Sequence, residues 1–99
     1  MITYKGIMEI KQIDTGGKGV FKAADNGKEA GKMTYVRAGE KRLIIDHTEV
    51  RPEYAGKGVG KQLVVAAVEY ARDNDMKILP LCPFAKRIFD KTPGIRDVL

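Results

Sequence analysis

The residues best placed to do chemistry are three glycines at alternate positions, Gly56, Gly58 and Gly60, with Lys57 and Lys61 beside them. They follow a β-branched segment and precede a helical pattern. Glycine lets the backbone approach a ligand closely, and the first turn of a helix offers N–H groups that have no partner within the helix. Such a turn binds anions, most naturally a phosphate. The segment therefore predicts a loop that holds a phosphorylated cofactor.

The spacing of these glycines excludes the two common nucleotide loops. A P-loop needs a glycine, four residues, and then Gly-Lys-Ser or Gly-Lys-Thr. When Gly60 and Lys61 are aligned to that pattern, Ala55 stands where the first glycine belongs and Gln62 where the hydroxyl belongs. The dinucleotide pattern Gly-x-Gly-x-x-Gly also fails, because its third glycine would fall on Lys61 or on Leu63. The cofactor must be one that a different loop recognises.

The loop resembles the Arg/Gln-x-x-Gly-x-Gly/Ala motif of the GNAT superfamily of acetyl-CoA-dependent N-acetyltransferases, which grips the pyrophosphate of coenzyme A. The segment here is Ala55-Gly56-Lys57-Gly58-Val59-Gly60, with Ala55 in place of the Arg or Gln. Two further segments are similar to a small, minimal branch of the superfamily. They are Asp46-His47-Thr48 before the loop and Leu81-Cys82-Pro83-Phe84-Ala85-Lys86 after the long helix. The resemblance spans roughly residues 28 to 91.

The resemblance implies acetyl-CoA as the cofactor and an unidentified amine, in a small molecule or a peptide, as the acceptor. The implied cofactor-binding residues lie at a strand end, in the loop and in the last helix; they are Glu49, Val50, Ala55, Gly56, Lys57, Gly58, Val59, Gly60, Lys61, Phe84 and Lys86. The backbone around Glu49 and Val50 is expected to polarise the thioester carbonyl. No metal site is expected. The alternative is a domain that binds coenzyme A as a sensor or interaction module, with little or no turnover.

His47 and Cys82 are the candidate catalytic residues, and each is the only one of its type. Histidine as a residue type has an unperturbed pKa near neutrality, which suits a general base. His47 could therefore act on an ammonium acceptor, or it could hold the strand geometry through a hydrogen bond. Cys82 precedes Pro83 and a short helix, whose N-terminus favours a thiolate. The thiol could accept the acetyl group, protonate the leaving thiolate, or be a small buried hydrophobic residue.

The elements that must position these residues follow from the apolar patterns. Strands are predicted over 7–13, 19–23, 30–36, 43–50 and 77–81, a long helix over 58–73, and a short helix around 84–89. The predicted fold class is α/β (α+β), a minimal GNAT-like fold with a mixed sheet of about five strands. The strand–helix–strand unit predicts that 43–50 and 77–82 run parallel through a right-handed crossover. In the superfamily these two strands splay apart at the loop end, and the pantetheine arm enters the gap.

Strict alternation along the strand at 43–50 predicts which side chains share a face. One face is expected to hold Leu43, Ile45, His47 and Glu49, and the other Ile44, Asp46, Thr48 and Val50. Both faces are apolar at the start of the strand, which favours a central strand covered on both sides.

Composition limits the class of protein. The chain has 99 residues, of which 43% are hydrophobic and 31% charged, which favours one globular domain over 1–99. It contains no apolar run of about 18 residues, as a membrane span requires, and its first residues are not those of a signal peptide. A single cysteine forms no intrachain disulfide, which favours a reducing, cytoplasmic setting. The oligomeric state is left open.

The net charge of +5 fits an anionic ligand, a solvated basic surface, or nucleic acid. The basic residues are scattered among acidic ones, and no aromatic residues are interleaved on a basic strand face. A small nucleic-acid-binding domain is therefore the least favoured hypothesis.

Overall fold

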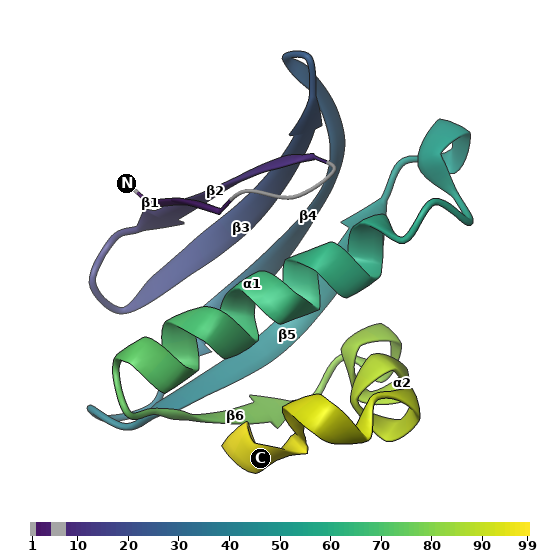
Figure 1. Cartoon of the computed structure of the whole chain (residues 1–99). Coiled ribbons are helices and arrows are strands. Elements are labelled where there is room, and N and C mark those ends of the chain that lie inside the picture. Colours follow the sequence, from purple (N-terminus) through teal and green to yellow (C-terminus); the bar gives the residue numbers. More distant parts are fainter. Residues whose placement is uncertain (1, 5–7) are drawn as a thin grey trace.

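The computed structural model describes residues 2–4 and 8–99. Its sheet has six strands in sequential order (Figure 1). They are β1 (Ile2–Tyr4), β2 (Glu9–Asp14), β3 (Lys18–Asp25), β4 (Lys28–Arg37), β5 (Arg42–Val50) and β6 (Lys77–Pro80). Neighbours from β1 to β5 are antiparallel, and β6 runs parallel to β5. The parallel pair confirms that the predicted strands at 43–50 and 77–82 run in the same direction.

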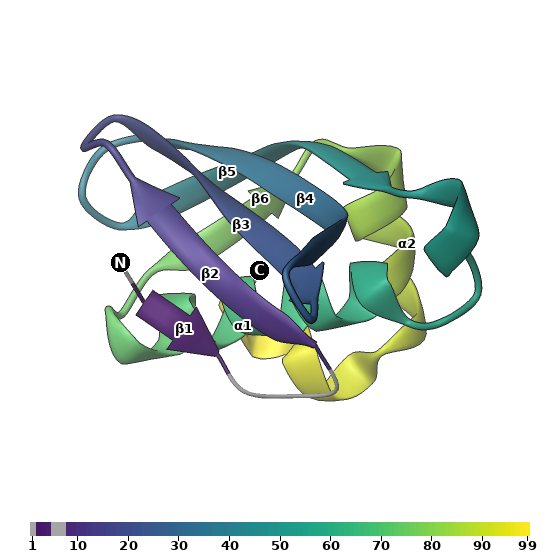
Figure 2. The same ribbon diagram turned by 90° about the horizontal axis from the view of Figure 1, so that it is seen from above.

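The helices gather on one side of the curved sheet (Figure 2). The long helix α1 (Val59–Asp73) crosses the sheet, and α2 (Pro83–Lys91) lies against α1, β5 and β6. Two short 3-10 helices, η1 (Pro52–Tyr54) and η2 (Pro93–Val98), flank them. We call the face of the sheet that packs on α1 the helix face and the opposite face the outer face.

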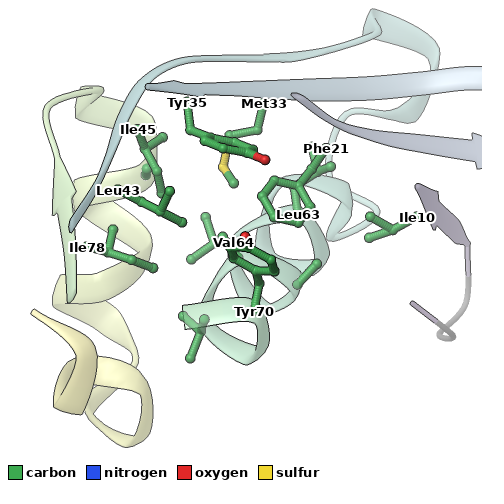
Figure 3. Close-up of a cluster of buried hydrophobic side chains, with 14 of the residues drawn as sticks. Ile10, Phe21, Met33, Tyr35, Leu43, Ile45, Leu63, Val64, Tyr70 and Ile78 are labelled. Carbon is green, nitrogen blue, oxygen red and sulfur yellow. The ribbon is translucent and has the colours of Figure 1, made fainter. Parts of the chain in front are cut away.

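The core lies between α1 and the helix face of the sheet (Figure 3). Leu63 and Val64 of α1 are fully buried against strand residues that include Phe21, Leu43 and Ile45. The apolar stripe of α1 drives this packing, because a helix with one apolar face is stabilised mainly by burying it. Asn74 caps the end of α1, where its side-chain Nδ2 donates to the Tyr70 carbonyl at 2.8 Å.

The mixed sheet and the two helices confirm the predicted α+β fold class. The sheet has one strand more than the five expected, because β1 pairs with β2 from Ile2↔Gln12 to Tyr4↔Ile10. The strand predicted over 7–13 corresponds to β2, and its first residue lies outside the described part of the chain.

A β-bulge in β5 overturns the predicted division of its side chains between faces. Tyr35 pairs with Ile45 and Thr34 pairs with His47, so Asp46 is an extra residue without a partner in β4. An extra residue shifts the alternation by one position. Beyond the bulge, Thr48 lies opposite buried Met33 on the helix face.

His47 and Glu49 therefore lie on the outer face, and they do not share the core face of Leu43 and Ile45 as strict alternation predicted. Val50, which pairs with Gly31, lies on the helix face with Thr48.

The parallel strands separate halfway along β5. Their pairing ends at Ile45↔Pro80, where the N–H groups of Leu81 and Cys82 both donate to the Ile45 carbonyl, at 3.0 and 3.1 Å. Beyond this point β5 continues to Val50, whereas the other chain turns into α2. The second half of β5 therefore has an edge that β6 does not cover.

Candidate functional site

A cavity of about 800 Å³ opens beside the uncovered half of β5. Its walls come from the start of β4, the end of β5, the segment that joins β5 to α1, the first turn of α1, and α2. The lining residues are Glu29, Gly31, Lys32, Thr48, Glu49, Val50, Arg51, Pro52, Tyr54, Ala55, Gly56, Gly58, Val59, Gly60, Lys61, Phe84 and Ile88. The cavity thus joins the glycine loop to the gap between the separated strands.

Gly56 and Gly58 give the loop its backbone conformation. Both have φ of +78°, and a Cβ added at either would meet nothing within 4 Å. Glycine is therefore needed for the left-handed backbone, which other residues rarely adopt, and not for lack of space. Gly58 is the N-cap of α1, whose first backbone bond runs from Gln62 N–H to Gly58 O at 3.1 Å. The N–H groups of 59–61 precede that bond, so α1 leaves them free for an anion.

Gly60 has a different role from its neighbours. A Cβ at this position would lie 2.1 Å from the ring of Phe84, which itself is 41% exposed and lines the cavity. Gly60 therefore lets α1 and α2 approach each other and hold the Phe84 ring at the cavity wall. This packing requirement was not predicted from the loop motif.

The cavity wall combines charged and apolar surface. Lys61 and the N–H groups at the start of α1 can face an anion, and Val50, Val59, Phe84 and Ile88 supply apolar surface. Glu29, Lys32, Glu49 and Arg51 add further charge. Such a wall suits an extended ligand with a phosphate group and a less polar arm.

Nine of the eleven sequence-predicted cofactor-binding residues line the cavity, and the described positions of Lys57 and Lys86 are not among its walls. Lys57 lies over the Tyr54 ring, with its Nζ 5.5 Å from the centroid. Lys86 pairs with Asp90 at 3.8 Å. Lys57 lies between the lining residues Gly56 and Gly58, and Lys86 lies two positions after Phe84.

Tyr54 supports the loop from beneath. Its side chain is buried, and its hydroxyl lies 3.1 Å from Asp25 Oδ2. Burial and then the Asp25 carboxylate raise the pKa of Tyr54, so the ring stays neutral under the two lysines, Lys28 and Lys57, that lie over it. The sequence alone could not distinguish this role from that of a surface tyrosine.

Cys82 lies on the helix face at the N-cap of α2, buried beside Thr48. Its thiol Sγ is 3.6 Å from Thr48 Oγ1. Burial raises the pKa of the thiol, but hydrogen bonds lower it by more, so the pKa is lowered overall. These bonds come from the N–H groups of Ala85 and Phe84 and from the hydroxyl and N–H groups of Thr48. Thr48 also lines the cavity, and the sequence did not single it out for the site because the bulge reverses its face.

His47 lies on the outer face, where its Nε2 is 3.1 Å from Glu49 Oε1. This hydrogen bond, followed by the charge of Lys32, holds the pKa of Glu49 below its ordinary value. The pair is exposed, with 60% of the His47 side chain accessible. The structure therefore does not bring His47 and Cys82 together, because the backbone of β5 lies between them.

The uncovered edge of β5 presents N–H groups to the cavity. Arg51 N–H donates to Ala30 O of β4 at 2.8 Å, and N–H directions alternate along an antiparallel strand. The N–H groups of Thr48 and Val50 consequently point away from β4, toward the side that β6 leaves open. These are donors of the kind that stabilise a developing oxyanion.

Within residues 2–4 and 8–99, no three His, Cys, Asp or Glu side chains gather where they could hold a metal ion. The same part of the chain contains no helix with the length and apolar character to cross a membrane.

Fold and cavity together define a class of protein that holds an extended anionic ligand between a helix N-terminus and two separating strands. The chain belongs to the GCN5-related N-acetyltransferase family, whose sequence model matches residues 20–98.

Similar proteins agree with this assignment. The solution structure of a GCN5-like protein from Staphylococcus aureus, described as a candidate N-acetyltransferase, is 36% identical and superposes with a TM-score of 0.68 over 89% of this chain and 85% of the other. A Bacillus anthracis protein described as a candidate streptothricin acetyltransferase, crystallised with acetyl coenzyme A, shares the fold. It has a TM-score of 0.64 at 20% identity, over 80% of this chain and 49% of its own.

Among curated relatives, Protein NATD1 of Xenopus tropicalis is 28% identical over 61 residues, which are 62% of this chain and 56% of the relative. The human Protein NATD1 is also 28% identical, over 54% of its length. The chain thus spans about half the length of the curated relatives it matches.

Proposed function

We propose that the chain binds acetyl-CoA in the cavity beside β5 and transfers its acetyl group to an amine. The observation that carries this proposal is the cavity itself, which runs from the N-terminus of α1 to the uncovered edge of β5. Family membership supports an acyltransferase activity, and the particular acceptor is not assigned.

The residues present fit the cofactor. The free N–H groups at the start of α1, with the charge of Lys61, suit the pyrophosphate, and the apolar wall at Val59 and Phe84 suits the pantetheine arm. Ala55 replaces the Arg or Gln of the motif, so the backbone and the lysines must supply the grip. When bound, acetyl-CoA supplies an acetyl group activated as a thioester.

One backbone group at the cavity and two side chains near it, His47 and Cys82, are assigned the remaining work; neither His47 nor Cys82 is among the lining residues. The Val50 N–H is placed to donate to the acetyl carbonyl oxygen as negative charge develops on it. His47, held by Glu49, is placed on the outer face to take a proton from an incoming ammonium group. Cys82, whose thiol lies by Thr48, either protonates the leaving sulfur or accepts the acetyl group before the amine does.

Calorimetric titration with acetyl-CoA tests the binding. We expect saturable binding to the wild type and at least about tenfold weaker binding to Gly58→Glu, because an added carboxylate at the helix N-terminus repels phosphate. Gly39→Glu is the matched control: its φ is +76°, close to that of Gly58, its added Cβ also meets nothing within 4 Å, and it lies away from the cavity. No binding to the wild type at millimolar acetyl-CoA, or equal loss in both variants, would contradict the proposal.

Turnover separates the enzyme from the alternative, a coenzyme A sensor or interaction domain. A panel of polyamines, aminoglycosides, amino acids and peptide amines should include at least one acceptor that releases coenzyme A at a rate lowered in His47→Gln. Binding without turnover on the whole panel would favour the sensor. A cytoplasmic location and a single domain over 1–99 stay predictions from the sequence.

A further inference from the structure

We propose that Lys32 is an acetyl acceptor within the same chain, so that the protein acetylates itself at the wall of its own cavity. This inference rests on the proposed binding of acetyl-CoA. It assigns a modification site to a residue of β4 that the glycine motif does not include.

The position of Lys32 distinguishes it from the other lysines that the structure describes. Only Lys32 and Lys61 are among the residues that line the cavity. Lys61 belongs to the first turn of α1, whose free N–H groups suit phosphate. Lys32 belongs to β4 and pairs with Glu49 on the outer face, so its long side chain would have to reach over β5 to the carbonyl that the N–H groups on the uncovered edge would hold.

The register of the sheet sets Lys32 beside a proton acceptor. Lys32 pairs with Glu49 across β4 and β5, which places the two Cβ atoms about 5 Å apart on the outer face. Glu49 in turn binds His47 Nε2 at 3.1 Å. The amine and the His47–Glu49 pair thus share one face and one end of the strand.

The amine of Lys32 forms no ion pair among the described residues, a property that it shares with Lys22, its cross-strand neighbour. Lys11, Lys28, Lys41 and Lys86 each pair with a carboxylate within 4 Å, whereas Lys32 is in none of the ion pairs found among the described residues. The residue is half-buried, so its hydrocarbon stem lies along the sheet and limits the positions of Nζ. Lys32 acts on Glu49 through its charge without forming an ion pair within 4 Å, and an amine held beside a reactive carbonyl gains from proximity.

The chemistry balances without a further reactant. The Lys32 ammonium first gives a proton to the His47–Glu49 pair, which passes it to water. Lys32 Nζ then forms a bond to the acetyl carbon, and the carbon–sulfur bond breaks. The electron pair goes to the sulfur, which leaves as coenzyme A thiol with the second proton of the amine. The product is Nε-acetyl-Lys32, and one positive charge is lost beside Glu49.

Mass spectrometry of the whole protein incubated with acetyl-CoA tests the inference. Lys22 is the matched control site, because it pairs with Lys32 on the same face but lies one strand further from the cavity. We expect Lys32 to be acetylated at least about tenfold faster than Lys22, at a fractional rate independent of protein concentration, because the reaction is intramolecular. Gly58→Glu should slow Lys32 to the rate of Lys22, and Lys32→Arg should abolish the fast phase.

Calorimetry on the same sample keeps the two proposals apart. If the wild type binds acetyl-CoA but Lys32 reacts no faster than Lys22, self-acetylation is wrong and the proposed cofactor stands. A fast phase that persists in Lys32→Arg, or that grows with protein concentration, would likewise overturn it. If the wild type does not bind acetyl-CoA, the proposed function is wrong and this inference with it.

Discussion

The three glycines of the loop are required for two different reasons. Gly56 and Gly58 are required by their positive φ, whereas Gly60 is required because the Phe84 ring occupies the place of its side chain. The cavity wall therefore depends on a contact between residues that lie far apart in the chain. A substitution at Gly60 acts on packing first and on ligand binding second.

Gly60→Ala should lower the free energy of unfolding by about 1–3 kcal/mol, because the added methyl overpacks the α1–α2 contact. Urea denaturation measures the change. Gly94→Ala is the control, since its Cβ would meet nothing within 4 Å and its φ is not positive. Adding Phe84→Leu to Gly60→Ala should restore part of the loss, and no recovery would show that the ring is not the obstacle.

Thr48 should set the ionisation of Cys82. The thiol pKa is lowered from its ordinary value of 9.0, in part by the Thr48 hydroxyl. Thr48→Val removes that donor to the thiolate, so the pKa should rise, and the fraction of thiolate at pH 8 should fall. Ultraviolet titration of the thiolate measures this. Thr34→Val is the control, since Thr34 faces away and bonds to Asp46 at 2.6 Å; an equal shift in both variants would contradict the assignment.

At the scale of elements, the bulge at Asp46 is the feature that the sequence concealed. Alternation assigned Thr48 and His47 correctly to opposite faces but put each on the wrong one, because nothing in the residue types marks the extra position. The strand, its bounds and its parallel neighbour were predictable from apolar pattern and crossover handedness. Local pattern thus predicts an element, whereas pairing with another strand decides which way its side chains point.

A hydrogen-bonded group of polar side chains joins β2, β4 and α1. Asp14 of β2 accepts hydrogen bonds from Tyr35 Oη at 2.6 Å and from Arg37 Nη2 at 2.7 Å, and Arg37 also bonds to Tyr70 of α1. Burial raises the pKa of Asp14, but the bonds from Tyr35 and Arg37 lower it more, so the pKa is lowered overall. Gln12 Nε2 donates to Tyr35 Oη at 2.8 Å and completes the group.

Asp14→Asn should lower the free energy of unfolding at pH 7 by about 1–3 kcal/mol, because it leaves the part-buried Arg37 without its partner. A carboxylate with a lowered folded pKa stabilises the fold above its unfolded pKa, near 3.9, and loses that contribution as the pH falls through the folded value. The difference between variant and wild type should therefore shrink below about pH 4. Urea denaturation at several pH values measures it.

Asp75→Asn is the control for the Asp14 variant. Asp75 is 92% exposed in its ion pair with Lys41, and its φ of +54° is one that Asn tolerates. We expect little change at either pH, and an effect as large as that of Asp14→Asn would refute a special role for the Asp14 carboxylate.

At the scale of the whole molecule, net charge and cavity charge act together on an anionic cofactor. Binding of acetyl-CoA should weaken as the salt concentration rises. The chain carries a net charge of +5, and salt screens its attraction for the phosphates of the cofactor. Lys61→Gln should weaken binding about threefold to tenfold and flatten the salt dependence, as expected for loss of one charge contact. Lys41→Gln removes the same charge far from the cavity and should leave the affinity nearly unchanged.

The three-dimensional site was only partly predictable for a related reason. The loop and its helix carry local signals, so Gly56, Gly58 and Val59 were identified from the sequence. Lys32 and Ile88 come from distant segments, and no local pattern marks a residue that reaches the cavity only after the sheet forms. β1 was missed because its three residues are too few to show alternation.

Because of the bulge at Asp46, the two faces of β5 beyond it carry residues with different expected partners. Thr48 and Val50 lie on the helix face, where the cofactor is expected, and His47 and Glu49 lie on the outer face, from which an amine would come, although Glu49 also lines the cavity. Substitutions on one face of β5 can therefore change the acceptor side while the side chains on the other face stay the same. Across the superfamily, substitutions along this strand should follow a period of two, with positions 48 and 50 nearly constant and positions 47 and 49 changing together as the acceptor changes.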